Sequence, residues 1–154
     1  MGLTNLSNER LLADTIGRLR HVTPAHRARW GRLNAHQMLC HLADACRVAL
    51  GERDAAPGAM PAAKRHFVRL VAFHTPLPWP RNLHTMAEVD PARQGTRPGD
   101  FDADLRTAIE LLTRVATDSG IDGHPHPMFG PLSRREWLRW AWMHTEHHLR
   151  QFGV

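Results

Sequence analysis

The sequence predicts an all-α protein, a bundle of helices interrupted by one long proline-rich loop. The chain is rich in Ala, Leu and Arg, poor in Val and Ile, and lacks Tyr, which favours helices over sheets. Apolar residues also recur at helical spacing in five segments. With 154 residues, 42% of them hydrophobic, we expect residues 1–154 to form a single domain around one core.

Two helices are expected in the first third of the chain. Residues 8–21 carry apolar side chains at helical spacing, and Ser7 is a candidate N-cap. Residues 35–50 form the second helix, because Asn34 and Gln37 have the spacing of a capping box. The apolar stripe of this second helix consists of Met38, Leu42, Ala45 or Cys46, and Ala49.

A long loop separates the third and fourth expected helices. The third helix covers residues 62–73, with Pro61 at its first turn. Residues 74–99 then contain a density of proline that no helix tolerates, namely Pro76, Pro78, Pro80, Pro91 and Pro98. Loops of this length inside compact domains are often functional. The fourth helix covers residues 103–117, and a second loop spans residues 121–132.

The fifth expected helix, residues 133–151, has the clearest signals. Ser133 and Glu136 form a capping-box pattern, and Gly153 can end the helix. At about 100° per residue, one set of side chains falls within roughly 40° of a single direction. This inward-facing set comprises Trp137, Ala141, His144, His148 and Gln151.

Three histidines form a candidate metal site. His144 and His148 are one turn apart on the inner stripe, where two imidazoles can reach one ion. His41 lies on the inner stripe of residues 35–50, and it is level with the other two if these helices run antiparallel. Three His ligands with a vacant fourth position are typical of catalytic zinc sites. The alternative is that each ring donates to a backbone carbonyl or a buried water.

The cysteines and the N-terminus indicate a cytoplasmic protein. Cys40 and Cys46 are six residues apart on one expected helix, so a disulfide between them would be strained. Neither belongs to a CxxC motif, and free thiols fit a reducing compartment. The first 14 residues contain two acids and no long apolar run, which excludes a signal peptide and a membrane span there.

The positive charge does not indicate a nucleic-acid partner. The formal net charge is +5, and every basic residue except Lys64 is an arginine. The arginines are scattered, Asp and Glu interrupt them, and no stacking aromatics interleave with them. We therefore expect a solvated arginine-rich surface, with no nucleic-acid and no membrane partner.

Two motifs resemble the DinB/YfiT-like superfamily of metal-binding four-helix bundles. Residues 30–42 read WGRLNAHQMLCHL, similar to the tryptophan-led entry into helix two that ends on a ligand histidine, here His41. Residues 144–152 read HTEHHLRQF, like the family's His-x-x-x-His followed by Gln. Trp79, Thr85 and residues 126–130 resemble a branch of the superfamily classed only as a domain of unknown function.

The resemblance implies a four-helix bundle with an additional helical segment, and a three-histidine site for zinc or nickel made by His41, His144 and His148. It also implies a homodimer. Members with known activity largely transfer or isomerise substrates with low-molecular-weight thiols such as bacillithiol or mycothiol. We therefore expect a metal-dependent, thiol-using transferase or isomerase acting on a small electrophilic molecule. This sequence departs from the superfamily's general pattern in having Leu-Arg, where that pattern has Arg-Gly, between His148 and Gln151. The proline-rich loop is a second difference, and it should reshape the pocket.

Several roles stay open at the level of sequence. Gln151, one turn past His148, could orient a ligand or the imidazole, and His36 could reach a substrate from the first turn of its helix. Both are candidate catalytic residues.

Trp79 either pins the proline-rich loop onto the bundle, which we favour, or lines a pocket. Histidines in the loops could act as acid–base groups if their loop covers the metal; they are His74, His84, His124 and His126. The alternative functions are a non-catalytic metal-binding or stress-response bundle and a metal-dependent hydrolase.

Overall fold

The computed structural model describes residues 4–58, 60–75 and 77–154, so Pro76 lies outside the described residues. The described part of the chain is mostly helical, as predicted. Its five α-helices are α1 (Glu9–Arg20), α2 (Ala35–Ala49), α3 (Ala62–His74), α4 (Phe101–Thr117) and α5 (Arg134–Phe152). A short 3-10 turn, η1 (Ala87–Val89), and a small hairpin of β1 (Pro125–His126) and β2 (Gly130–Pro131) complete the secondary structure.

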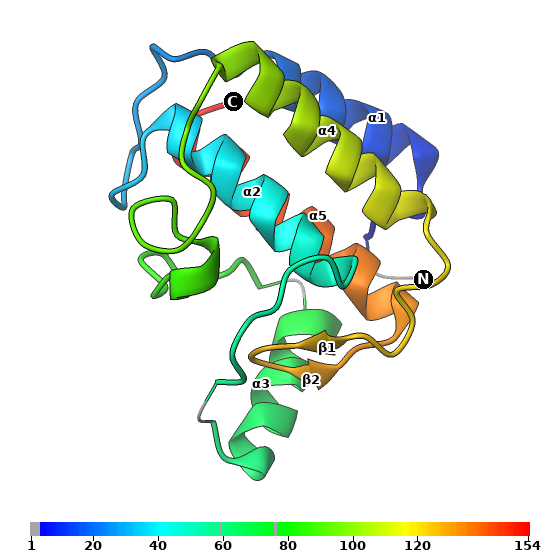
Figure 1. Ribbon diagram of the computed structural model, residues 1–154. Helices are drawn as coiled ribbons and strands as arrows, with labels where there is room; N and C mark the ends of the chain where they lie inside the picture. The colour runs from blue at the N-terminus through cyan, green and yellow to red at the C-terminus, as the bar shows by residue number, and fades with distance from the viewer. Residues whose placement is uncertain (1–3, 59, 76) are drawn as a thin grey trace.

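Four of these helices, α1, α2, α4 and α5, contact one another around a common core, whereas α3 extends from one end and contacts α5 (Figure 1). Helices α2 and α5 run antiparallel: Figure 1 shows the C-terminus, which follows α5, beside the start of α2. The inward-facing stripes predicted for α2 and α5 face this core, whereas Phe67 and Leu70 of α3 are exposed. The fully buried side chains of the core include Leu19, Met38, Leu39, Leu112, Val115, Trp137, Leu138 and Leu149.

Local capping interactions set the helix ends. The capping boxes predicted for α2 and α5 are both present, each with reciprocal side-chain and backbone hydrogen bonds. The predicted cap of α1 was wrong by one residue: Asn8, not Ser7, accepts a hydrogen bond from the amide of Leu11. Ser7 lies in the preceding turn, where its amide donates to the side chain of Asn5. Asn and Ser cap helices about equally well, so this turn decides between them.

The long proline-rich loop is fastened to α2 by a buried carboxylate. Asp44, which is 0% exposed, accepts hydrogen bonds from both the amide and the hydroxyl of Thr96, at 2.6 and 2.8 Å. Arg47 and Arg53 supply positive charge to the same carboxylate. These bonds hold the end of the loop against α2, so η1 and its neighbours keep a fixed position beside that helix.

The second loop contains the hairpin that the sequence did not predict. Pro125 pairs with Pro131 and His126 with Gly130, which has a positive φ of 71°. A strand pair of two residues on each side has no alternating pattern to detect. Contacts with the rest of the fold hold it in place, including the bond from the Trp137 indole nitrogen to the carbonyl of His124.

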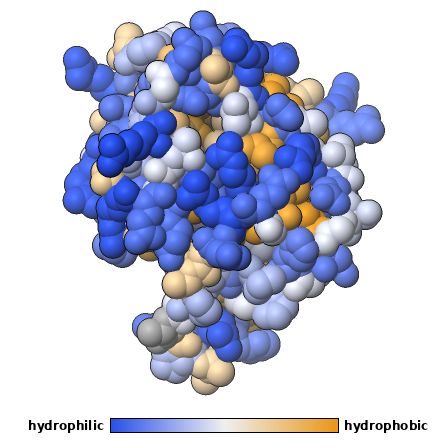
Figure 2. Space-filling view, in the orientation of Figure 1, coloured by the Kyte–Doolittle hydropathy of each residue, from blue (hydrophilic) through white to orange (hydrophobic). Residues whose placement is uncertain are grey.

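Polar residues cover much of the surface in one view of the molecule (Figure 2), in agreement with the solvated arginine-rich surface expected from the sequence. Figure 2 shows one face on which hydrophilic residues dominate and apolar ones appear between them. Cys40 and Cys46 are both buried and free, in agreement with the prediction of no disulfide. None of the helices in the described residues combines the length and the apolar character needed to cross a membrane.

Candidate metal centre

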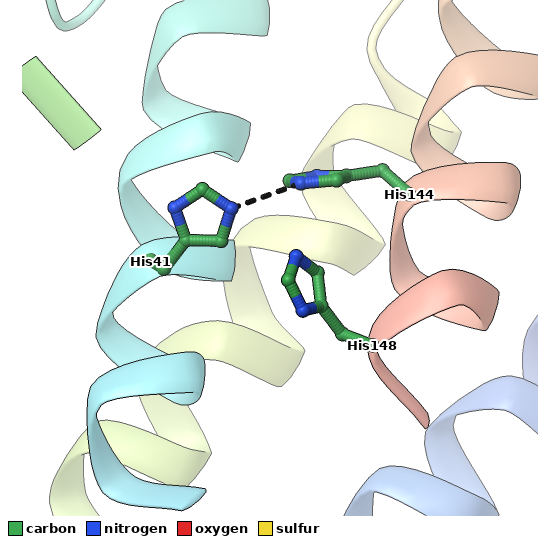
Figure 3. A group of neighbouring side chains, drawn as sticks. All are labelled: His41, His144 and His148. Atoms are coloured by element: carbon green, nitrogen blue, oxygen red, sulfur yellow. Dashed lines mark hydrogen bonds between the residues drawn. The ribbon is translucent and has the colours of Figure 1, made fainter. Parts of the chain in front are cut away.

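Three imidazole rings meet between α2 and α5 (Figure 3). One potential ligand atom from each of His41, His144 and His148 lies within 4.8 Å of the others. The Nε2 atoms of His41 and His144 are 3.0 Å apart, and each pair of rings has its centroids 4.9 Å apart. The antiparallel packing of the two helices brings the second turn of α2 level with the last turns of α5. The group therefore has the geometry to hold one ion.

A backbone carbonyl fixes the ring of His41. Its Nδ1 lies 2.8 Å from the carbonyl oxygen of Val89 at the end of η1. Because a carbonyl oxygen only accepts, Nδ1 must carry the proton and donate it. The neutral ring then presents the lone pair of Nε2 to the other two histidines. The proline-rich loop thus sets the tautomer of the α2 histidine.

A glutamine fixes the ring of His148 in the same way. The side-chain nitrogen of Gln151 donates to the carbonyl of Trp30 at 2.6 Å, which sets the orientation of the amide. Gln151 Oε1 then lies 2.7 Å from His148 Nδ1 and accepts a hydrogen bond from the Nδ1–H group. His148 Nε2 is left with a free lone pair. Metal-binding histidines usually donate their other ring nitrogen to an oxygen in this manner.

The electrostatics keep the three rings neutral, which is the form that binds metal. Burial lowers the pKa of His41. Burial, with the other histidines of the cluster as a further cause, holds the pKa values of His144 and His148 well below 6.5. The nitrogens of neutral His41 and His144 would set two lone pairs against each other unless a proton or a cation stood between them. Since all three rings can offer such a lone pair, the residues fit a divalent cation.

The three histidines and Gln151 line a cavity of about 820 Å³. Both loops contribute to its wall, so neither covers the site alone. Most of the lining is apolar, and its large side chains include Trp30, Trp79, Met86, Met128, Phe129 and Trp140. This volume is within the usual range for small-molecule sites.

Trp79 belongs to this wall, against our preference for a purely pinning role. Its ring centroid lies 5.8 Å from that of His144, and its indole nitrogen is buried without a hydrogen-bond partner among the described residues. Trp140 flanks the same histidine, with its ring stacked at 4.8 Å. Two indoles thus restrict the position of His144.

The structure does not bring His36 to the cavity. Its Nε2 lies 2.7 Å from Asp104 Oδ2 on α4, and neither residue lines the cavity. The same oxygen accepts from the Cys40 thiol at 3.6 Å and from the amide of Gly99 at 2.9 Å. His36, Cys40 and Asp104 form a second group of potential ligands, but here they act as a hydrogen-bonded link between α2 and α4. His36 therefore lies outside the cavity that the three histidines line, hydrogen-bonded to α4.

Sequence reasoning did not single out His126 from the other loop histidines. The structure buries it in the cavity wall, whereas His124 donates from its Nδ1 to the carbonyl of Ala49 at the end of α2 and does not line the cavity. The one sequence feature that set His126 apart was its place in residues 126–130, which resemble a branch of the DinB/YfiT-like superfamily. Glu146 on α5 forms an ion pair with Arg18 on α1.

One comparison with known proteins gives a match. A family model described as "Protein of unknown function (DUF1569)" matches residues 5–153, which is nearly the whole chain. No curated protein and no solved structure matches the chain significantly. The description of the family names no activity, so the geometry of the site has to carry the functional argument.

Proposed function

The chain belongs to the DUF1569 family of proteins of unknown function, and from its site we propose a divalent-metal-dependent enzyme that uses a low-molecular-weight thiol to transfer or isomerise a small electrophilic substrate. One observation carries this proposal. Three neutral imidazoles, with ligand atoms within 4.8 Å of one another, stand in the wall of a cavity of about 820 Å³. A purely structural metal site has no need of such a cavity, whereas a catalytic one does.

The proposal includes membership of the DinB/YfiT-like superfamily. Its support is the pair of sequence motifs, the mutual contacts of α1, α2, α4 and α5, and the origin of the three histidines on α2 and α5. The same resemblance supports a homodimer. Sedimentation velocity of the purified protein tests the homodimer, because a single monomeric species would contradict it.

His41, His144 and His148 would hold the cation, and zinc or nickel suits three imidazole donors. A bound divalent cation supplies one kind of chemistry here: it favours the deprotonated form of a thiol or water that coordinates it. The remaining tasks belong to the protein. Val89 and Gln151 orient two of the rings, while the apolar wall excludes water and binds the apolar part of the electrophile.

The first experiment measures metal content by plasma mass spectrometry after purification with limiting chelator. We expect the wild-type protein to retain zinc or nickel and His144→Ala to lose it. His124→Ala is the matched control, because His124 is also a partly buried, hydrogen-bonded histidine but lies outside the cavity and outside both groups of potential ligands. Equal metal content in wild type and His144→Ala would end the proposal of a metal site.

The second experiment measures turnover of the metal-loaded protein with 1-chloro-2,4-dinitrobenzene and a panel of thiols that includes cysteine and bacillithiol. The thiol sulfur forms a bond to the ring carbon, chloride leaves, and the thiol proton passes to solvent. We expect catalysis in wild type and in His124→Ala but none in His144→Ala. Metal retention without turnover with any thiol of the panel would favour the non-catalytic alternative instead.

A further inference from the structure

His126 is a second functional candidate in the same cavity. It lies at the end of β1, is 7% exposed, and lines the cavity. Its ring is enclosed by three aromatic rings at centroid distances of 4.8 to 5.3 Å, those of Phe129, Trp140 and Trp137. A histidine in such apolar surroundings costs free energy unless its polar atoms have partners.

The hydrogen bonding of His126 fixes which nitrogen carries the proton. The backbone amide of Met128 donates to His126 Nδ1 at 3.1 Å. Because an amide N–H only donates, Nδ1 must hold the lone pair, and the neutral ring carries its proton on Nε2. Among the described residues, no partner forms a hydrogen bond with that Nε2, and it is not one of the fully buried polar atoms, so it is open to the cavity that His126 lines. The acceptor for this N–H is therefore water or a ligand in the cavity.

Burial also keeps this ring uncharged. It lowers the pKa of His126 to about 3, and no neighbouring carboxylate opposes the shift. A neutral imidazole is a very weak acid, so the Nε2 proton is donated in a hydrogen bond and is not transferred. Neutral histidine donors of this kind polarise a carbonyl oxygen in other enzymes.

The position of His126 relates it to the three-histidine group. Trp140 lies between them, with its ring 5.1 Å from that of His126 and 4.8 Å from that of His144. One small molecule in the cavity can thus approach the cluster with one end and His126 with the other. The apolar lining between them suits an uncharged body.

We propose that His126 binds the carbonyl oxygen of the substrate through its Nε2–H, and that the substrate class is an uncharged, predominantly apolar carbonyl compound. This deepens the proposed function, on which it rests for the use of the cavity. A carboxylate is disfavoured because the neutral ring offers no positive charge. A hydrocarbon is disfavoured because it would displace water from the N–H and leave it without an acceptor.

The test compares two probes of nearly equal shape, acetophenone and α-methylstyrene, in which C=CH₂ replaces C=O. Binding to the metal-loaded protein is measured by calorimetry and by quenching of tryptophan fluorescence. We expect wild type to bind acetophenone about 10-fold more tightly, which is the effect of one buried hydrogen bond. His126→Phe should abolish the preference and leave α-methylstyrene binding within about 2-fold, and His126→Gln should restore part of it. His124→Phe, in the same hairpin but outside the cavity, should behave as wild type.

Equal affinities of the two probes in wild type, no binding of either, or a preference that persists in His126→Phe would each overturn the proposal. A measurement on wild type alone guards against a variant that does not fold: ¹⁵N NMR of the imidazole nitrogens should show the Nε2–H tautomer of His126 at neutral pH. The Nδ1–H tautomer or an imidazolium would overturn it. Metal content, determined in the same samples, separates the two ideas, because loss of metal contradicts the proposed function and not the role of His126.

Discussion

Gln151 and His148 form one hydrogen-bonded unit, in which Gln151 Oε1 lies 2.7 Å from His148 Nδ1. The other end of the amide donates to the carbonyl of Trp30 at 2.6 Å, so the glutamine cannot turn without losing a bond. The unit therefore links the segment before α2 to the orientation of a histidine on α5. Gln151, a candidate catalytic residue in the sequence, has a positioning role in the structure.

Replacing this glutamine should weaken metal binding without removing a ligand. In Gln151→Leu the ring of His148 loses the acceptor for its Nδ1 proton, and we expect metal affinity to fall about 10- to 100-fold. Competition with a chromophoric chelator measures the affinity. Gln94→Leu, at an exposed position in the proline-rich loop, should leave it unchanged. The same affinity in both variants would show that the glutamine does not orient the ring.

Gly31 should be intolerant of a methyl group, because it supports the same glutamine. Its φ is 82°, and an added Cβ would lie 2.6 Å from Gln151 Nε2. We expect Gly31→Ala to cost about 1–2 kcal/mol of unfolding free energy from the backbone alone and to weaken metal binding as well. Gly17→Ala is the control: nothing lies within 4 Å of its added Cβ in α1, so it should stabilise the protein by up to about 1 kcal/mol. Urea unfolding measures both changes, and an unchanged metal affinity in Gly31→Ala would contradict the link to Gln151.

Asp44 should contribute strongly to stability through the proline-rich loop. Asp44→Ala leaves the amide and hydroxyl of Thr96 without their acceptor, and we expect a loss of about 3 kcal/mol in urea unfolding. The loop that presents the Val89 carbonyl to His41 should loosen too, so metal affinity should decrease. Asp14→Ala, an exposed acid on α1, is the matched control. A loss below about 1 kcal/mol would mean that other contacts fasten the loop.

Glu136 should make stability depend on pH in the acid range. Burial tends to raise its pKa, but hydrogen bonds from Arg69 and Ser133 outweigh it and lower the pKa to about 2. A carboxyl group in the unfolded chain titrates near 4.5, so the stabilisation is complete above that pH and is lost as the pH falls from 4.5 toward 2. Glu136→Gln should therefore cost about 2 kcal/mol at neutral pH and clearly less at about pH 3.5. Glu110→Gln, at an exposed site on α4, should show no such difference, and an equal cost of Glu136→Gln at both pH values would contradict the lowered pKa.

The helices were largely readable from the sequence because their signals are local. The Asn34–Gln37 and Ser133–Glu136 boxes involve residues three positions apart, and both form as expected. The helical period of 3.6 residues also fixes which side chains share a face. For this reason the inward direction of His41, His144 and His148 could be stated before any coordinates, given antiparallel helices.

The tertiary structure alone decided what surrounds those rings. The carbonyls of Val89 and Trp30 set the tautomers, yet a backbone carbonyl has no sequence signature. Trp79 and His126 lie in loops, where no periodic pattern relates sequence position to direction, and His36 was drawn to Asp104 by a contact 68 residues away in the chain. The sequence by itself therefore determined the helices and the shared face of the three histidines, because these depend on neighbours within one or two turns. The cavity, its loop-borne wall and the orientation of each ring depend on contacts between distant segments, which only the folded chain brings together.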